Sequence, residues 1–260
     1  MSGGAWLALV IVVVALGGLF AFTRTLFWKR LLLRRATEHA AAGRIGRMIG
    51  LLERNRDRGS VSDPLTNALI FFNIRAGQLE RARELVEEAM ARGDASAAAE
   101  AQLGFIAGAG GDSGAAEGHY RKALSMDPEL RGTLNVNLAA LLIERGEKLD
   151  EAEALLREAL ESRTGPARSG VHLNLALLHL AREEGREALV QSLTGYELLP
   201  GIEPTRETRS HALALASKAY ELLGDAEEAG KMARRAVKLA EGLPGEAALR
   251  AQLKALLAPE

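Results

Sequence analysis

The sequence predicts an all-α protein in which an N-terminal transmembrane helix precedes a stack of repeated helical units. Three observations predict this class. Residues 5–22 form an almost wholly apolar run, a pattern of small and large apolar residues recurs about every 34 residues between 63 and 243, and no strand-type alternation follows the run. A length of 260 residues suits one domain plus an anchor.

The apolar run has the length and the flanks of a membrane-spanning helix. No charged residue precedes Arg24, and Trp6 and Trp28 bracket the run 22 positions apart. At a rise of 1.5 Å per residue this separation is about 33 Å, close to the hydrocarbon thickness of a bilayer. Because Trp favours the membrane–water interface, we expect residues 1–29 to be a single-pass anchor.

The charges that flank the run predict its orientation. The first four residues carry no Lys or Arg, whereas Arg24, Lys29 and Arg30 follow the apolar stretch. The positive-inside rule then places the N-terminus outside and the body in the cytoplasm, at a cell (inner) membrane; the excess of Arg over Lys is typical of a bacterial, GC-rich genome. A cleaved signal peptide is the alternative, but the positive n-region of such a peptide is missing. Gly17 and Ala21 form a small-xxx-small pair through which two membrane helices could dimerise.

Residues 30–61 are rich in arginine and carry apolar residues at helical spacing. One interpretation is a basic juxtamembrane helix that contacts anionic lipid headgroups, each charge contributing about 1 kcal/mol near the surface. The other is a degenerate repeat that caps the solenoid. The two interpretations are compatible, and the sequence does not choose between them.

The internal repeat is clearest between residues 103 and 128. Its marker residues are Leu103, Gly104, Ala116, Tyr120, Ala123 and Pro128. Their spacing resembles the tetratricopeptide repeat (TPR), a motif of 34 residues. The same frame extends over residues 62–243 as five repeats, at about 63–96, 97–130, 131–166, 169–202 and 210–243. The resemblance implies a right-handed α-solenoid of about five antiparallel helix pairs, closed by a capping helix in 244–260.

Composition and motifs argue against an enzyme. The absence of Cys removes thiolate zinc sites and cysteine nucleophiles, and a net charge of −1 does not indicate nucleic-acid binding. The segment GGDSG at 110–114 resembles the surroundings of a serine-protease nucleophile, but the repeat frame places it in a turn between helices. His172 and His179 lie about 10 Å apart on one predicted helix, too far to share a metal ion. We therefore expect no catalytic residue, no metal site and no cofactor.

The resemblance also implies where a partner binds, because TPR domains typically hold peptide or helix segments on the concave face formed by their first helices. Gln102, Asn137 and Asn174 occupy the same position in three successive repeats, as an amide ladder that grips a peptide backbone would. Ordinary surface amides are the alternative. The other candidate groove residues are Asn67, Phe71, Phe105, Val136, Leu173, Leu177 and Lys218, some of which could instead be inter-repeat core. Such a groove favours an apolar or amphipathic segment over an acidic tail.

Together these features predict a membrane-tethered scaffold or adaptor that binds a protein partner in the TPR groove and assists assembly or regulation of an envelope complex. Two alternatives stay open. The chain is a structural subunit of a larger membrane machine, with contacts on its convex face, or it is a periplasmic TPR protein in envelope biogenesis, released by signal cleavage.

Overall fold

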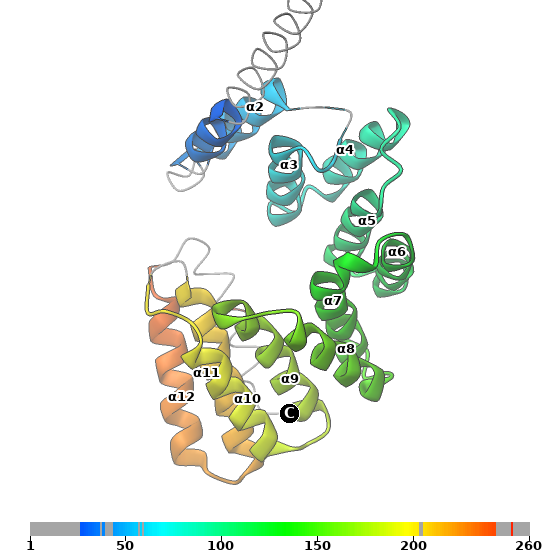
Figure 1. Cartoon of the computed structure of the whole chain (residues 1–260). Helices are drawn as coiled ribbons and strands as arrows, with labels where there is room; N and C mark the ends of the chain where they lie inside the picture. Colours follow the sequence, from blue (N-terminus) through cyan, green and yellow to red (C-terminus); the bar gives the residue numbers. More distant parts are fainter. Residues whose placement is uncertain are drawn as a thin grey trace, which may run out of the picture. The chain divides into compact units, whose positions relative to one another are not determined.

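The computed structural model describes residues 27–36, 38–39, 44–56, 58, 60–202, 205–242 and 251. Within these ranges every regular element is a helix, so the prediction of an all-α helical solenoid is confirmed. The chain divides into two compact units, Met1–Gly111 and Asp112–Glu260, and each is described by itself (Figure 1).

The first unit is a run of short antiparallel helices. Residues 27–36 are helical and are followed by α2 (Ile45–Asn55), α3 (Pro64–Arg75), α4 (Leu79–Ala91) and α5 (Ala97–Ala109). Neighbours in the chain are neighbours in space, with α2 against α3, α3 against α4 and α4 against α5. The largest fully buried side chains of their shared core are Met48, Leu52, Leu65, Leu69, Ile70, Leu85 and Ile106.

The start of α3 ties the helix at 27–36 into this unit. The Asp63 carboxylate accepts hydrogen bonds from the backbone N–H groups of Leu65 (3.2 Å) and Thr66 (3.1 Å), which caps the helix. Lys29 forms an ion pair with the same carboxylate. The sequence placed Lys29 among the basic residues of the membrane anchor, and the structure pairs it with a carboxylate 34 residues further along the chain.

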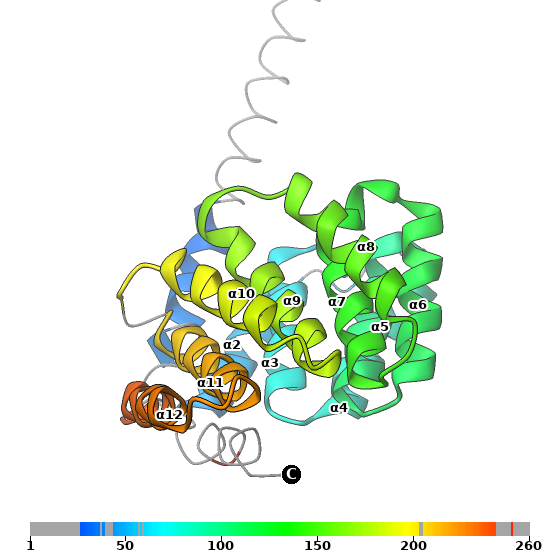
Figure 2. The same ribbon diagram turned by 90° about the horizontal axis from the view of Figure 1, so that it is seen from below.

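The second unit continues the pattern of antiparallel pairs, with a short 3-10 turn before α7 and another before α9. Its elements are α6 (Ser113–Met126), η1 (Pro128–Leu130), α7 (Arg131–Glu144), α8 (Leu149–Glu161), η2 (Gly165–Arg168), α9 (Ser169–Ala181), α10 (Gly185–Glu197), α11 (Arg206–Leu222) and α12 (Ala226–Ala240). Figure 1 and Figure 2 both show α9 to α12 side by side in chain order. The first helices of successive pairs, α7, α9 and α11, also contact one another.

Small residues at one repeated position let paired helices approach. In the second helix of each pair this position holds a buried alanine: Ala82, Ala116, Ala152, Ala188 and Ala229. Gly195 is a second small residue of α10, and its backbone lies close against α9. A Cβ atom there would meet Leu173 Cδ2 of α9 at 2.7 Å, so the contact between α9 and α10 requires glycine or movement of Leu173.

Just after each first helix ends, the turn to its partner places one residue in the left-handed region. This residue is glycine in most turns, for example Gly224 with φ 77°, but it is Glu183 (φ 59°) between α9 and α10. The next N–H then bonds back to the helix end, from Glu184 to the His179 carbonyl at 2.8 Å. Glu183 therefore carries the steric cost of a Cβ atom in a conformation that suits glycine.

We predict that Glu183→Gly raises the free energy of unfolding by about 0.5–1 kcal/mol, because it removes this steric cost. Urea unfolding followed by circular dichroism measures the change. The matched control is Gly224→Ala, which adds a Cβ atom at the equivalent turn and should lower stability by about 1 kcal/mol. A loss of stability in Glu183→Gly would show instead that the Glu183 side chain contributes to the fold.

Ion pairs join successive helix pairs along the turn edge of the second unit. Arg182, just after α9, donates to Glu153 at 2.6 Å and to Asp150 at 2.5 Å, both on α8. The hydrogen bonds from Arg182 and then from Arg157 hold the pKa of Glu153 below its ordinary value of 4.5. A carboxylate with a lowered pKa stabilises the folded state above pH 4.5, and this contribution is lost as the pH falls through the lowered value.

We predict that Glu153→Gln lowers the free energy of unfolding by about 1 kcal/mol at pH 7 and by less at pH 3, because the contribution of the charged carboxylate is lost as the pH falls through its lowered pKa. Urea unfolding at the two pH values tests this. Glu161→Gln, at an exposed position at the end of the same helix, serves as the control and should change little. An equal loss at both pH values would mean that packing, and not charge, accounts for the effect.

No helix among the described residues is long and apolar enough to cross a bilayer. The predicted span with Trp6 and Arg24, and the Gly17/Ala21 pair within it, lie outside the described residues. The same is true of the predicted capping helix, 244–260, apart from the helical residue 251.

Candidate partner-binding groove

The second unit has a groove of about 540 Å³ between its first helices α9 and α11. One wall comes from α9 and the other from α11. The lining residues are Gly170, Leu173, Asn174, Leu177, Glu207, Thr208, His211 and Leu215. Three of these, Leu173, Asn174 and Leu177, are residues that the sequence placed in a partner-binding groove.

Leucines form the apolar part of the groove. Leu173 and Leu215 are 8% and 4% exposed and pack with Ala176 and Ala212, so they serve as inter-helix core and as the floor of the groove at once. Leu177 is 37% exposed, and its side chain is open to solvent. A partner side chain over this floor would meet apolar surface that the fold already holds in place.

Polar groups lie beside this floor. Asn174 of α9 and Thr208 of α11 are half-buried and offer an amide and a hydroxyl. His211 of α11 is also half-buried; burial lowers the pKa of its imidazole below the ordinary value of 6.5, and the nearby Glu207 carboxylate opposes this shift. The imidazole is therefore neutral at pH 7 and can both donate and accept a hydrogen bond.

The ladder residues are not equivalent in the structure. Asn137 is half-buried on α7, and its amide donates to the Thr133 carbonyl of its own helix at 3.1 Å, which leaves its oxygen to accept a bond. Val136 packs against the core around Leu142 and Leu156. Asn137 and Asn174 thus belong to adjacent first helices of one unit, whereas Gln102 belongs to the other unit.

The first unit carries the remaining apolar candidates. Phe71 of α3 is 53% exposed and meets Phe72 edge to face, with ring centroids 5.5 Å apart. Asn67, one turn earlier, is exposed, while Gln102 and Phe105 on α5 are half-buried. Phe71 is the large aromatic side chain that this face of α3 leaves open to a partner.

Lys218, the last candidate, forms an ion pair with Glu221 of its own helix at 3.1 Å. A lysine already paired in this way is a weak receptor for an acidic tail, in line with the expectation of an apolar segment.

The residues that the sequence analysis considered for catalysis or metal binding have local structural roles. In the GGDSG segment, Asp112 caps α6 by accepting from the Ala115 N–H at 2.9 Å. His172 bonds to Gln191 at 2.7 Å, and His179 bonds to Glu184 at 2.6 Å. Among the residues that the structure describes, no group of three or more His, Asp or Glu side chains could hold a metal ion.

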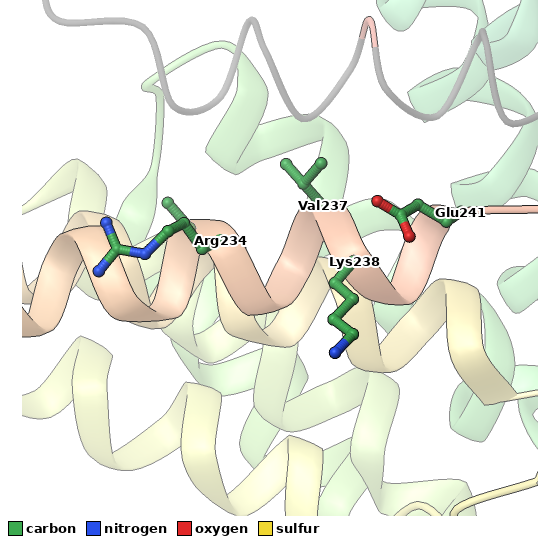
Figure 3. A pocket seen from close by; sticks show the side chains of 5 residues that line it. Arg234, Val237, Lys238 and Glu241 are labelled. Atoms are coloured by element: carbon green, nitrogen blue, oxygen red, sulfur yellow. The ribbon is translucent and has the colours of Figure 1, made fainter.

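A second hollow lies on α12, but only residues of that helix and Glu241, which follows it, line its described surface. Figure 3 shows Arg234, Val237, Lys238 and Glu241 projecting from it. With one described wall, it offers a partner less enclosure than the groove between α9 and α11.

Sequence reasoning missed the α11 wall of the groove. Gly170 and His211 occupy the same place in their repeats, as do Asn174 and Leu215, but α11 begins at residue 206, four residues before the predicted repeat. The signal that could have found Thr208 is therefore an amphipathic pattern that starts before the repeat frame, whereas His211 lies within the frame at the position that Gly170 occupies one repeat earlier.

Comparison with known proteins agrees with this architecture. A sequence profile described as the tetratricopeptide repeat matches residues 210–242, the stretch that contains most of α11 and all of α12. The chain contains a tetratricopeptide repeat. The match falls on the last of the five predicted TPR windows. A search of curated protein sequences gave no match.

Solved structures share the TPR-type fold. PilW, described as a widely conserved type IV pilus biogenesis factor, has a TM-score of 0.60 at 18% identity, over 86% of this chain and 98% of its own. BtubC from P. vanneervenii has a TM-score of 0.57 at 19% identity, over 84% and 91%. The Cut9–Hcn1 hetero-tetramer of APC/C gives 0.62 at 11% identity, over 88% and 41%. At these identities the likeness shows the fold alone.

We predict that His211 titrates with a midpoint below 6.5, because its ring is partly removed from water within the TPR groove. An NMR titration of the imidazole Cε1–H signal measures this midpoint. Glu207→Gln should lower it further, since the carboxylate that favours the charged ring is gone. A midpoint at or above 6.5 in the wild type would show that the ring is solvated and does not form a buried wall of the groove.

Proposed function

We propose that this chain is a membrane-tethered scaffold that binds an apolar or amphipathic segment of a protein partner in the α9/α11 groove. In this way it assists assembly or regulation of an envelope complex. The proposed role is non-catalytic and needs no cofactor. The observation that carries the proposal is the groove itself, with its leucine floor and its neutral amide, hydroxyl and imidazole groups.

The chemistry of the groove supports a protein segment as the ligand. Burying one leucine-sized side chain contributes about 1.5–3 kcal/mol, so a partner residue that covers Leu177 would supply a useful part of a binding energy. Asn174 can pair with a partner's peptide bond whatever its side chains, because an amide both donates and accepts. The TPR fold, which presents such faces for protein binding, is consistent with this role.

The proposed tether rests on the sequence of the first 30 residues. The apolar run, its bracketing Trp6 and Trp28, and the cations Arg24 and Arg30 favour a single span with the N-terminus outside and the TPR units in the cytoplasm. In the described part of the chain, Trp28 and Arg30 are exposed on the helix at 27–36, as residues at a membrane interface would be.

A site-specific photo-crosslinking experiment in native membranes tests the scaffold role. We predict that a photoreactive residue at Leu177 captures a protein through an apolar or amphipathic segment. We also predict that Leu177→Lys weakens binding of that purified segment at least tenfold, because it places a charge on the apolar opening. The matched control is Val190 on α10, which is 56% exposed and does not line the groove.

Capture from both positions, or an equal loss of binding in Val190→Lys, would refute the groove and favour a structural subunit that packs through its outer surface. N-terminal sequencing of the mature chain tests the tether separately. A chain that keeps residues 1–22 agrees with an anchor, whereas a chain cleaved after the apolar run would favour a periplasmic TPR protein.

A further inference from the structure

A basic cleft in the first unit is not explained by partner binding. It lies between the helical residue His39 and one face of α2, and it has a volume of about 370 Å³. We call it the α2 cleft; its lining residues are His39, Gly46, Arg47, Gly50, Leu51 and Arg54. None of these residues is acidic, and Arg44 reaches the cleft's edge through a 3.1 Å bond from its Nε to His39 Nδ1.

The arginines of the cleft differ from a neighbouring arginine that serves the fold. Arg56 is buried and donates to Glu53 at 3.1 Å and to Glu88 at 2.5 Å. Arg47 and Arg54 are exposed, and neither forms an ion pair with any residue that the structure describes. Two guanidinium groups beside one cleft, without carboxylate partners among the described residues, form a receptor for an anion.

Two glycines leave the α2 backbone at the floor of the cleft open to a ligand. Gly46 and Gly50 lie one helical turn apart on the same face of α2, although glycine inside a helix costs about 1 kcal/mol relative to alanine. A Cβ atom at Gly46 would meet no described atom within 4 Å, and one at Gly50 would meet only Arg54 Nη1, at 3.5 Å. Packing within the described unit therefore does not require either glycine.

Other features of the same unit favour a lipid surface over a free anion as the ligand. The helix at 27–36 exposes Phe27 (64%) and Trp28 (50%), which meet edge to face with ring centroids 6.2 Å apart. Arg30 and Arg35 on the same helix are exposed. Residues 27–58 contain nine Lys or Arg and three Asp or Glu, whereas the whole chain has a net charge of −1. Exposed aromatic rings beside exposed cations suit the headgroup layer of an anionic bilayer.

We propose that the α2 cleft binds the phosphate group of an anionic phospholipid headgroup. The guanidinium groups of Arg47 and Arg54 donate to the phosphate oxygens in the planar geometry that arginine offers, and the glycine floor admits the headgroup. This inference rests on the proposed tether, since it names the lipid class beside the anchor, but it does not involve the α9/α11 groove.

The test uses the full chain in a neutral detergent and measures dissociation constants for three probes: dihexanoyl-phosphatidylglycerol, dihexanoyl-phosphatidylcholine and inorganic phosphate. We predict that the phosphatidylglycerol binds at least tenfold more tightly than the phosphatidylcholine or inorganic phosphate. Arg47→Ser/Arg54→Ser should weaken phosphatidylglycerol about 25-fold, because each lost charge corresponds to roughly a fivefold change. The charge-matched control, Arg157→Ser/Arg186→Ser at exposed sites of the second unit, should bind as the wild type does.

Three outcomes would overturn the proposal. Equal binding of the two lipids would mean simple partition into the detergent, and inorganic phosphate binding as tightly as phosphatidylglycerol would mean a free-phosphate site. Unchanged binding in Arg47→Ser/Arg54→Ser would exclude the cleft. Arg47→Lys/Arg54→Lys keeps the charge without the planar geometry and should regain part of the affinity, which separates loss of charge from loss of fold. Because both lipids dissolve in detergent, the result does not depend on whether residues 5–22 span a bilayer or whether the groove binds a partner.

Discussion

The close approach of paired helices is the constraint on which the rest of this structure depends. Each second helix presents a buried alanine, such as Ala152 or Ala188, to its partner, and no bulkier side chain fits there without separating the backbones. Leucines beside these contacts then fill the remaining volume, as Leu156 and Leu178 do in the second unit. Since one pair buries only part of its apolar surface, neighbouring pairs must stack, and a solenoid results.

The same constraint produces the candidate site. Gly195 lets α10 approach α9 so closely that Leu173 is held against it, and the other side of Leu173 is floor for the groove between α9 and α11. The groove is thus a by-product of packing that stabilises the fold in any case. A partner that binds there meets leucines whose conformational entropy has already been lost, which favours affinity.

The arginines of this chain fall into two groups, those that form ion pairs within the fold and those whose charge is available to a ligand. Arg182, Arg145 and Arg121 each bond to carboxylates on other helices, so their charges join successive helix pairs of the second unit. Arg47 and Arg54 have no such carboxylate partner among the described residues, whereas the nearby Arg56 forms ion pairs with Glu53 and Glu88. Their charge is therefore available to a ligand, and the exposed Trp28 in the same unit favours a ligand at a membrane surface.

The sequence by itself determined the helical class and the repeat, because small residues such as Ala116 and Ala152 recur at a fixed spacing and leave a periodic trace. It also placed Leu177 and Asn174 on the face where the structure has a groove. Only the tertiary structure decided which side chains complete that groove, since α11 starts before the repeat frame, which adds Thr208, and packs beside α9, which brings His211 to the groove. Only the tertiary structure pairs Lys29 with Asp63, because an ion pair between residues 34 positions apart depends on how helices pack and leaves no local pattern in the chain.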